Sequence, residues 1–247
     1  MSAFWFALGF LTRVPTPALD FSDREAQARA LAWYPLVGAM IGGLLSLLAW
    51  IATSLGVAPL LTAALLLALW VWISGGLHLD GLADCADAWA GGHGDRERTL
   101  RILKDPAAGP MGVIALVLVL LLKFAALASL PPDAWRWLWL VPALGRAAAV
   151  GLFLTLPYVR AAGLGIELAQ APRRPASFAV ALSAVFALLF GLPGLALLAT
   201  SLAVFLLWRA DCQRRLQGFT GDAAGAVIER VETAALVAAC VVGAWVG

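Results

Sequence analysis

Charge is scarce in this sequence. Asp, Glu, Lys and Arg make up 13% of the 247 residues and apolar residues 62%, whereas soluble domains are about 25% charged and about half apolar. This composition excludes a water-soluble globular protein. The net charge of +2 is also small, and no basic stripe with interleaved aromatic residues is present, so we expect no nucleic-acid partner.

Cysteine is rare as well. The three cysteines, Cys85, Cys212 and Cys240, form no CxxC pattern and no Cys/His spacing typical of zinc sites. Neither a disulfide framework nor a zinc centre is expected. The first dozen residues are apolar but lack a basic start and a small-residue cleavage site, so no signal peptide is predicted.

Apolar runs of about 20 residues, the length that crosses a bilayer, are abundant. They predict seven transmembrane helices, at about residues 33–55, 58–79, 111–130, 135–156, 176–191, 194–210 and 226–246. The fifth and sixth are short, and the Gly-Leu-Pro-Gly between them predicts a tight turn. We therefore expect an all-α polytopic bundle, a single integral membrane catalytic domain over residues 1–247. Residues 4–12 are too few to cross and are expected at the interface.

Basic residues gather in alternate connectors of this seven-helix plan. Of the 17 Lys and Arg residues, 13 fall on one side: three before the first helix, four between the second and third, three between the fourth and fifth, and three before the seventh. Cytoplasmic loops carry such an excess. The sequence thus predicts a protein of the cytoplasmic (inner) membrane, with its N-terminus inside and its C-terminus outside.

Three aspartates follow the second apolar run. At about 100° per residue, Asp84 and Asp87 lie about 40° and 20° to either side of Asp80 on one helix face. Three clustered anions at the edge of hydrocarbon repel one another, and a divalent cation relieves that repulsion. Oxygen ligands suit Mg²⁺, which shares its coordination with substrate phosphates. The pattern predicts a Mg²⁺-dependent phosphoryl-transfer site; a solvated helix end is the alternative.

Two cations lie inside apolar runs: Lys123 in the third and Arg146 in the fourth. Because an unpaired charge in hydrocarbon costs several kcal/mol, both are expected to face inward and pair with protein acids or with substrate phosphate oxygens. His78 lies about 160° around the helix from Asp80, so a structural or second-site role is favoured over a shared metal.

Two other polar stretches lie on the predicted side of the acids. Residues 95–105 predict a short amphipathic helix that ends at Lys104 and Asp105, a candidate phosphate contact and a candidate ligand. A Gly-rich turn at residues 216–225 includes Gly221 and Asp222. Backbone N–H groups in such a turn can cradle phosphate, and Asp222 could hold a second metal or orient the nucleophile.

Several motifs occur in order along most of the chain. They are FLTRVP at residues 10–15, YPLVG at 34–38, HLDGLAD at 78–84 with Asp87, DR at 95–96, RILKD at 101–105, GPMG at 109–112, and GDAAGA at 221–226 with Glu229. Together they resemble the cobalamin synthase family, the adenosylcobinamide-GDP ribazoletransferases.

The resemblance implies a membrane enzyme of late cobalamin biosynthesis that uses Mg²⁺. Its substrates would be adenosylcobinamide-GDP and α-ribazole or its 5′-phosphate, and its products GMP and adenosylcobalamin or its 5′-phosphate. By position, the implied metal ligands are Asp80, Asp84 and Asp87, the implied catalytic residues are Asp84 and Asp222, and the implied substrate contacts are Lys104, Asp105, Lys123, Arg146 and Gly221.

Two alternatives belong to other classes. A CDP-alcohol phosphotransferase of lipid synthesis also uses membrane acids, but its signature has Arg after Ala, whereas Asp84 follows Ala83 here. An ion-coupled transporter would use Lys123 and Arg146, but its site should lie near the midplane on repeated, broken helices. The acids crowd one boundary and no internal repeat is visible. A homo-oligomer is compatible with the sequence.

Overall fold

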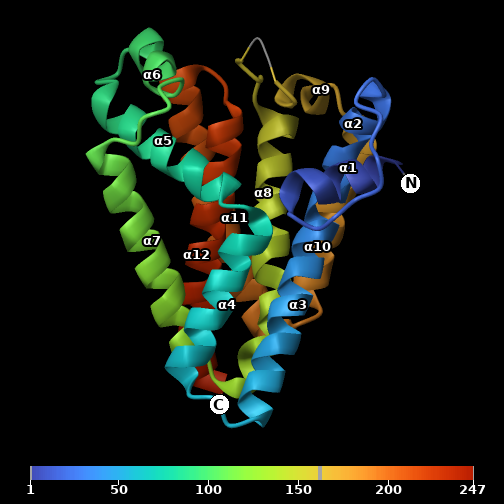
Figure 1. Cartoon of the computed structure of the whole chain (residues 1–247), viewed down its shortest axis with the longest axis vertical. Helices are drawn as coiled ribbons and strands as arrows, with labels where there is room; N and C mark the ends of the chain where they lie inside the picture. The colour runs from blue at the N-terminus through green and yellow to red at the C-terminus, as the bar shows by residue number, and fades with distance from the viewer. Residues whose placement is uncertain (1, 161–162, 247) are drawn as a thin grey trace.

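Seven long helices run side by side in the computed structural model, which describes residues 2–160 and 163–246, with side chains up to residue 243 (Figure 1). They are α3 (Tyr34–Ser54), α4 (Pro59–Ser74), α7 (Pro110–Ser129), α8 (Leu140–Thr155), α10 (Arg173–Leu188), α11 (Gly191–Leu216) and α12 (Gly221–Val246). Each overlaps one predicted apolar run. The chain is therefore the expected all-α membrane bundle.

The helices differ in how well they suit a bilayer. Within the described residues, four are long and apolar enough to cross one alone: those that contain α3, α7, α8 and α11. The helix α4 qualifies only together with α5 (Leu77–Gly91), as one bent span. The helix α10 has 16 residues, and α12 carries Glu229, Arg230 and Glu232. The count of seven crossings stays a prediction.

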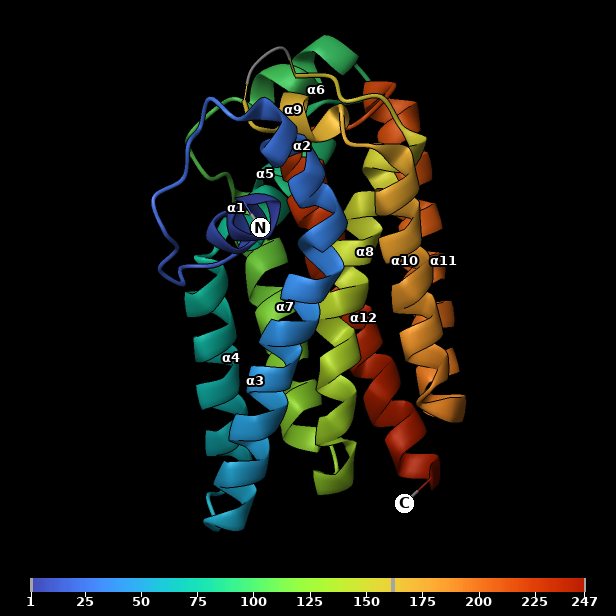
Figure 2. The ribbon, with the colours of Figure 1, turned by 90° about the vertical axis from the view of Figure 1, so that its right-hand side faces the viewer.

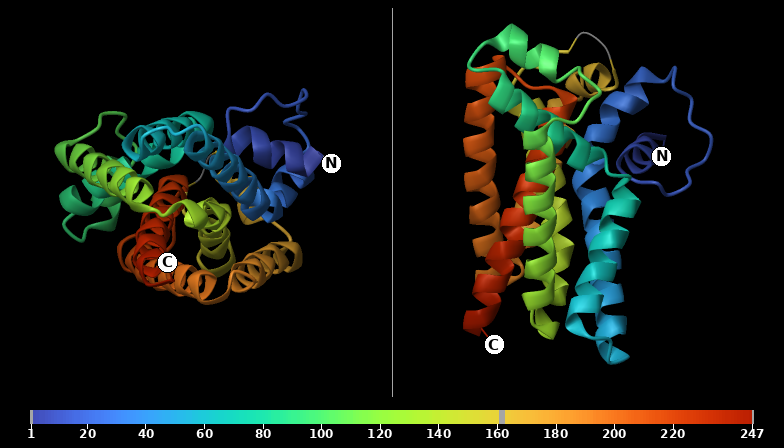
Figure 3. Two further views of the ribbon diagram at one scale, coloured as in Figure 1. Left: turned by 90° about the horizontal axis from the view of Figure 1, so that it is seen from below. Right: turned by 60° about the vertical axis from the view of Figure 1, so that its left-hand side comes forward.

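Two glycines separate α4 from α5. Gly75 and Gly76 have φ angles of 67° and 74°, in the left-handed region that glycine adopts without strain. The two helices meet at 86°, and α5 runs obliquely across the end of the bundle (Figure 3). The prediction that the second apolar helix continues to residue 79 was wrong, because the chain turns after Ser74.

Short helices cover the same end of the bundle. The helix α1 (Ser2–Leu11) is apolar but only 10 residues long, and it lies across the long helices, so that Figure 2 shows it nearly end-on. This confirms that the first segment does not cross. The predicted short helix after the acids is also present. The other short helices at this end are α2 (Arg24–Ala30), η1 (Leu31–Trp33), α6 (Arg96–Ile102) and α9 (Gly165–Ala169). The helix η2 (Pro132–Trp139) lies at the opposite end, where it packs beside the last turns of α12.

The helices α8 and α12 form the centre of the bundle. In the apolar span that contains α8, 72% of the residues are buried, against 22% for α7 and for α11, so α7 and α11 are peripheral and present apolar side chains outward. The helix α12 packs against α5, α7, α8 and α11. Its first turn lies at the end of the bundle that α5 crosses, and the C-terminus lies at the other end (Figure 1).

Candidate functional site

The helix α5 meets the start of α12 at Gly81. A Cβ atom on Gly81 would lie 2.7 Å from the carbonyl oxygen of Asp222 and 3.0 Å from its Cα, so a larger residue would push the two helices apart. Because Asp80 precedes Gly81 and Asp84 follows one turn later, this close approach brings Asp222 to the acids of α5. We call Asp80, Asp84 and Asp222 the acid cluster.

Charge in the acid cluster is poorly balanced. Burial, reinforced by repulsion from Asp80 and Asp222, raises the pKa of Asp84 to about 6. Burial also raises the pKa of Asp222, although the nearby Arg160 guanidinium opposes that rise. A cation bound between these carboxylates would relieve both the repulsion and the desolvation.

Arg160, which follows α8, is the cation that the structure adds to the cluster. Its Nη2 donates to Oδ2 of Asp222 at 2.6 Å and to the carbonyl oxygen of Leu103 at 2.8 Å. From the sequence, Arg160 is only one of the three basic residues between the fourth and fifth predicted helices, with no predicted role in the site. Its place directly after the fourth apolar run, on the side of the acids, was the available signal. The bond to Leu103 also draws the next residues, Lys104 and Asp105, toward the cluster; both are exposed.

Asp87 is occupied differently from the other acids. Its Oδ2 accepts the Gly109 N–H at 2.7 Å and its Oδ1 accepts the Gly112 N–H at 2.9 Å. These amides lie at the start of α7, where N–H groups lack partners within the helix. Asp87 thus caps α7 and fixes it to α5. Its role as a metal ligand stays a prediction that this geometry does not favour.

A closed metal cage is absent from the part of the chain that the structure describes: no three His, Cys, Asp or Glu side chains there are placed to hold one ion. Mg²⁺ often binds through one or two carboxylates and completes its shell with water and substrate phosphates. Asp80 and Asp84 fit this open kind of site.

A second set of charges lies deeper in the bundle. Nζ of Lys123 on α7 is 2.7 Å from Glu229 Oε2 and 2.6 Å from Glu232 Oε2, and Arg146 on α8 pairs with Glu232. At most 5% of any of these side chains is exposed. We call these four residues the buried ion network. The predicted pairing of both cations with protein acids is confirmed. Their contact with substrate phosphate stays a prediction that gains no support from such burial.

Glu232 and His78 are two residues around these cations whose contacts the sequence did not predict. Glu232 was missed as a partner, although it and Glu229 stand three residues apart in an apolar run and therefore share a helix face. His78 is buried on α5, and its Nδ1 lies 3.5 Å from Nη2 of Arg146. His78 thus contacts the network rather than the acid cluster.

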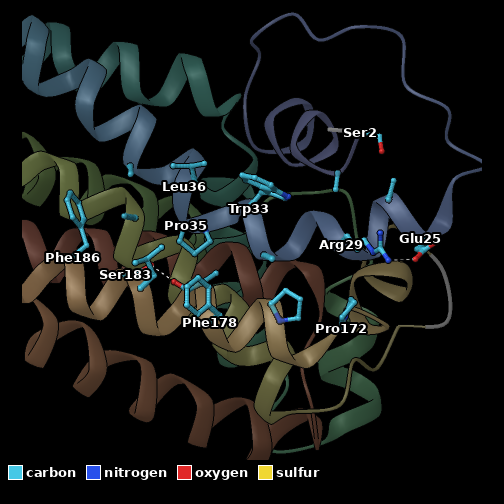
Figure 4. Close-up of a pocket in the computed structure, with 18 of the residues that line it drawn as sticks. Ser2, Glu25, Arg29, Trp33, Pro35, Leu36, Pro172, Phe178, Ser183 and Phe186 are labelled. Atoms are coloured by element: carbon cyan, nitrogen blue, oxygen red, sulfur yellow. Dashed lines mark hydrogen bonds and ion pairs between the residues drawn. The ribbon is translucent and has the colours of Figure 1, made fainter.

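A cavity of about 1010 Å³ opens elsewhere, between α3 and α10 (Figure 4). None of the predicted site residues lines it. Its cation, Arg29, pairs with Glu25 at 2.5 Å. This cavity lacks the clustered carboxylates that a phosphoryl-transfer site would need, so its volume alone does not identify it as the site.

Comparisons with known proteins point to the same chemistry. A family model described as Cobalamin-5-phosphate synthase matches residues 3–240. An adenosylcobinamide-GDP ribazoletransferase of Pseudomonas entomophila (strain L48) is 52% identical over 243 residues, 96% of this chain and 98% of the relative. One from Pseudomonas aeruginosa is 52% identical over 235 residues, 94% of this chain and 95% of the relative. No solved structure matches the chain.

Proposed function

Because this chain belongs to the cobalamin-5-phosphate synthase family, we propose that it is a membrane transferase that joins α-ribazole, or its 5′-phosphate, to adenosylcobinamide-GDP. The reaction releases GMP and forms adenosylcobalamin or its 5′-phosphate. The observation that carries this proposal is the match itself: a relative aligns with 96% of the chain, and the family model covers residues 3–240, a range that contains the acid cluster.

The bond changes follow from the two substrates. A ribazole hydroxyl attacks the phosphorus attached to cobinamide, the bond from that phosphorus to GMP breaks, and the hydroxyl proton goes to a base. We assign Asp222 as this base or as the group that orients the nucleophile. Burial, which raises its pKa, makes its carboxylate more basic.

Arg160 is our candidate for a contact with the reacting phosphates. It lies beside Asp222 and is about a third exposed, at 29% of its side chain, so a substrate can reach it. A guanidinium donates two parallel hydrogen bonds to a phosphate group. Lys104, Asp105 and Gly221, near the same end of α12, are further candidates for substrate contact.

Asp80 and Asp84 would hold Mg²⁺. The bound ion would offset charge on the phosphoryl oxygens and on the departing GMP. Support comes from the unbalanced charge of the acid cluster, which raises the pKa of Asp84 to about 6, and from the partial exposure of both residues.

The active face should be cytoplasmic, in the inner membrane, with the N-terminus inside and the C-terminus outside. The acid cluster, α6 and α9 lie at one end of the bundle and the C-terminus at the other (Figure 1), and the basic connectors belong to the first end. A C-terminal alkaline phosphatase fusion should be active and a C-terminal fluorescent protein dark. The reverse result would contradict this orientation.

The test of the reaction is incubation of the purified protein in liposomes with adenosylcobinamide-GDP, α-ribazole 5′-phosphate and Mg²⁺. GMP and a cobalamin product should appear together by mass spectrometry, and neither should form without the ribazole. Absence of product from folded protein would contradict the reaction. Undiminished product in the presence of EDTA would contradict only the metal.

A further inference from the structure

A second lateral cavity, of about 920 Å³, lies between α7 and α11. Residues of α12 also line it. Figure 3 (right) shows the ribbon of α12 between those of α7 and α11. Much of its lining is aliphatic and includes Leu118, Leu122, Val204, Leu207, Val237 and Ala238. Leu118 and Leu207 are 55% and 71% exposed, so the cavity opens on the apolar outer surface. We call it the α7–α11 groove.

Two stacked indoles and one arginine, Arg230, line one end of this groove. Trp89 of α5 stacks on Trp208 of α11, with ring centroids 5.1 Å apart. Arg215 donates to the carbonyl oxygen of Trp89 at 3.1 Å. Arg230 lies over the Trp208 ring at 4.6 Å, but it makes no hydrogen bond or ion pair with any residue that the structure describes. Arg230 is therefore an exposed cation without an anionic partner.

An acid in the groove lining does not neutralise this cation. Asp211 also lines the groove, but it pairs with Arg214, on its own helix. Arg230 thus leaves the groove with one uncompensated positive charge. An anionic group that reached it would form a charge-assisted hydrogen bond.

Arg230 also lies level with Trp208, where the sequence of α11 changes from apolar to charged. Along α11 the residues up to Trp208 are mostly apolar, whereas charged residues begin at Arg209. Tryptophan favours this boundary between hydrocarbon and water. The free cation therefore marks the level of lipid phosphates, with an apolar slot extending from it along α7 and α11.

We propose that the α7–α11 groove binds a glycerophospholipid, with its phosphate on Arg230 and an acyl chain between α7 and α11. The groove also exposes Leu82, Cys85 and Ala86 of α5. At about 100° per residue these lie on the opposite side of α5 from Asp80 and Asp84. The lipid would thus support the helix of the acid cluster from behind. The proposal rests on the groove and not on the proposed reaction.

The cavity between α3 and α10 supplies an internal control. It is of similar size and is also largely apolar, but its Arg29 is paired with Glu25. If volume and apolar lining were sufficient, both cavities would bind lipid alike. If the unpaired cation determines which lipid binds, only the α7–α11 groove should prefer lipids that carry a phosphate.

The test uses the full-length protein in dodecyl maltoside, which contains no phosphate. Phosphatidylglycerol with a diazirine on one acyl chain is compared with diacylglycerol that bears the same chain. After irradiation, peptides of α7 and α11 should carry roughly ten times more phospholipid label, because a hydrogen bond to a charged group is worth about that factor in affinity. Arg230→Gln should remove this preference, Arg230→Lys should keep most of it, and Arg29→Gln should leave it unchanged.

Equal labelling of α7 and α11 by the two probes in the wild-type protein would overturn the proposal. A phosphate preference that survives Arg230→Gln would overturn the assignment of the phosphate to Arg230. The wild-type comparison of probes needs no variant, so it decides the question even if Arg230→Gln does not fold. Elution volume and helical circular dichroism identify the variants that do fold.

Discussion

Asp222 and Glu232 are acids of one helix, α12, about three turns apart, yet their surroundings are opposite. Asp222 is 16% exposed, and around it lie two other carboxylates and one arginine. Glu232 is fully buried and contacts two cations, Lys123 and Arg146. The acid cluster carries excess negative charge, whereas the buried ion network has two cations for two carboxylates.

This difference in charge balance indicates that the acid cluster is a site for ligands, whereas the buried ion network supports the fold. The network satisfies its own charges, so it needs nothing from outside, and loss of one member would leave an unpaired buried charge. The acid cluster leaves charge unsatisfied, which costs the free protein stability and favours a bound cation. Substitutions in the two sites should therefore act on different observables.

Asp84→Asn should have the largest effect, a loss of turnover. A metal supplies several kcal/mol to a charged transition state, so loss of a ligand should lower kcat/KM by roughly a thousand-fold or more. Membrane insertion and elution volume should stay as in the wild type. The measurement is GMP release in liposomes. Near-normal release would remove Asp84 from the proposed metal site.

Glu232→Gln should act on stability. It leaves Lys123 and Arg146 with Glu229 alone, and removal of one partner from a buried ion pair costs about 3–5 kcal/mol. The melting temperature should fall steeply. Glu229→Gln is the matched control: it should cost less, because Glu232 remains for both cations. Equal melting temperatures for the two variants would contradict the central place of Glu232.

Local features of this fold were predictable. The apolar runs predicted the positions of the long helices, because a helix that crosses a bilayer needs about 20 consecutive apolar residues. The shared face of Asp80 and Asp84 followed from helical spacing. The turn at Gly75 and Gly76 was not predicted. Glycine occurs both where a helix leaves room for a neighbour and where the backbone adopts a positive φ angle, and the sequence alone does not distinguish the two.

Partner choice between helices was the harder part. The sequence showed that Lys123 and Arg146 needed anions, and Glu229 and Glu232 are acids within an apolar run, so the match could have been made by charge balance. Nothing in the spacing of Asp87 pointed to the amides of Gly109 and Gly112, because capping by a distant side chain depends on how two helices pack.

Arg160→Gln tests the one cation that the structure adds to the acid cluster. Loss of a charge-assisted contact to phosphate should lower kcat/KM by roughly ten- to a hundred-fold and weaken product inhibition by GMP. The kcat/KM of Arg160→Lys should lie between those of the wild type and Arg160→Gln, since lysine keeps the charge but not the paired donors. Unchanged inhibition by GMP, despite slower turnover, would show that Arg160 only positions Asp222 and Leu103.

The smallest expected effect is a gain in stability from Asp84→Asn. Its sign is opposite to that of Glu232→Gln, which should lower stability. Because the pKa of Asp84 is raised from 3.8 to about 6, the folded protein holds this proton more tightly than the unfolded chain does. Ionised Asp84 therefore costs stability above about pH 6, and the cost disappears as the pH falls toward 3.8. Asn has no charge, so without Mg²⁺ Asp84→Asn should be more stable than the wild type at pH 8.

Solvent screening limits this gain to about 1 kcal/mol, or roughly 2–4 °C in melting temperature. Scanning fluorimetry in detergent should show the difference at pH 8 and a smaller one at pH 5. Added Mg²⁺ should stabilise the wild type more than Asp84→Asn, since binding to the folded state raises its stability, and so narrow the gap. If Asp84→Asn melts below the wild type at pH 8 without Mg²⁺, the acid cluster is a structural element like the buried ion network, and the contrast between the two sites fails.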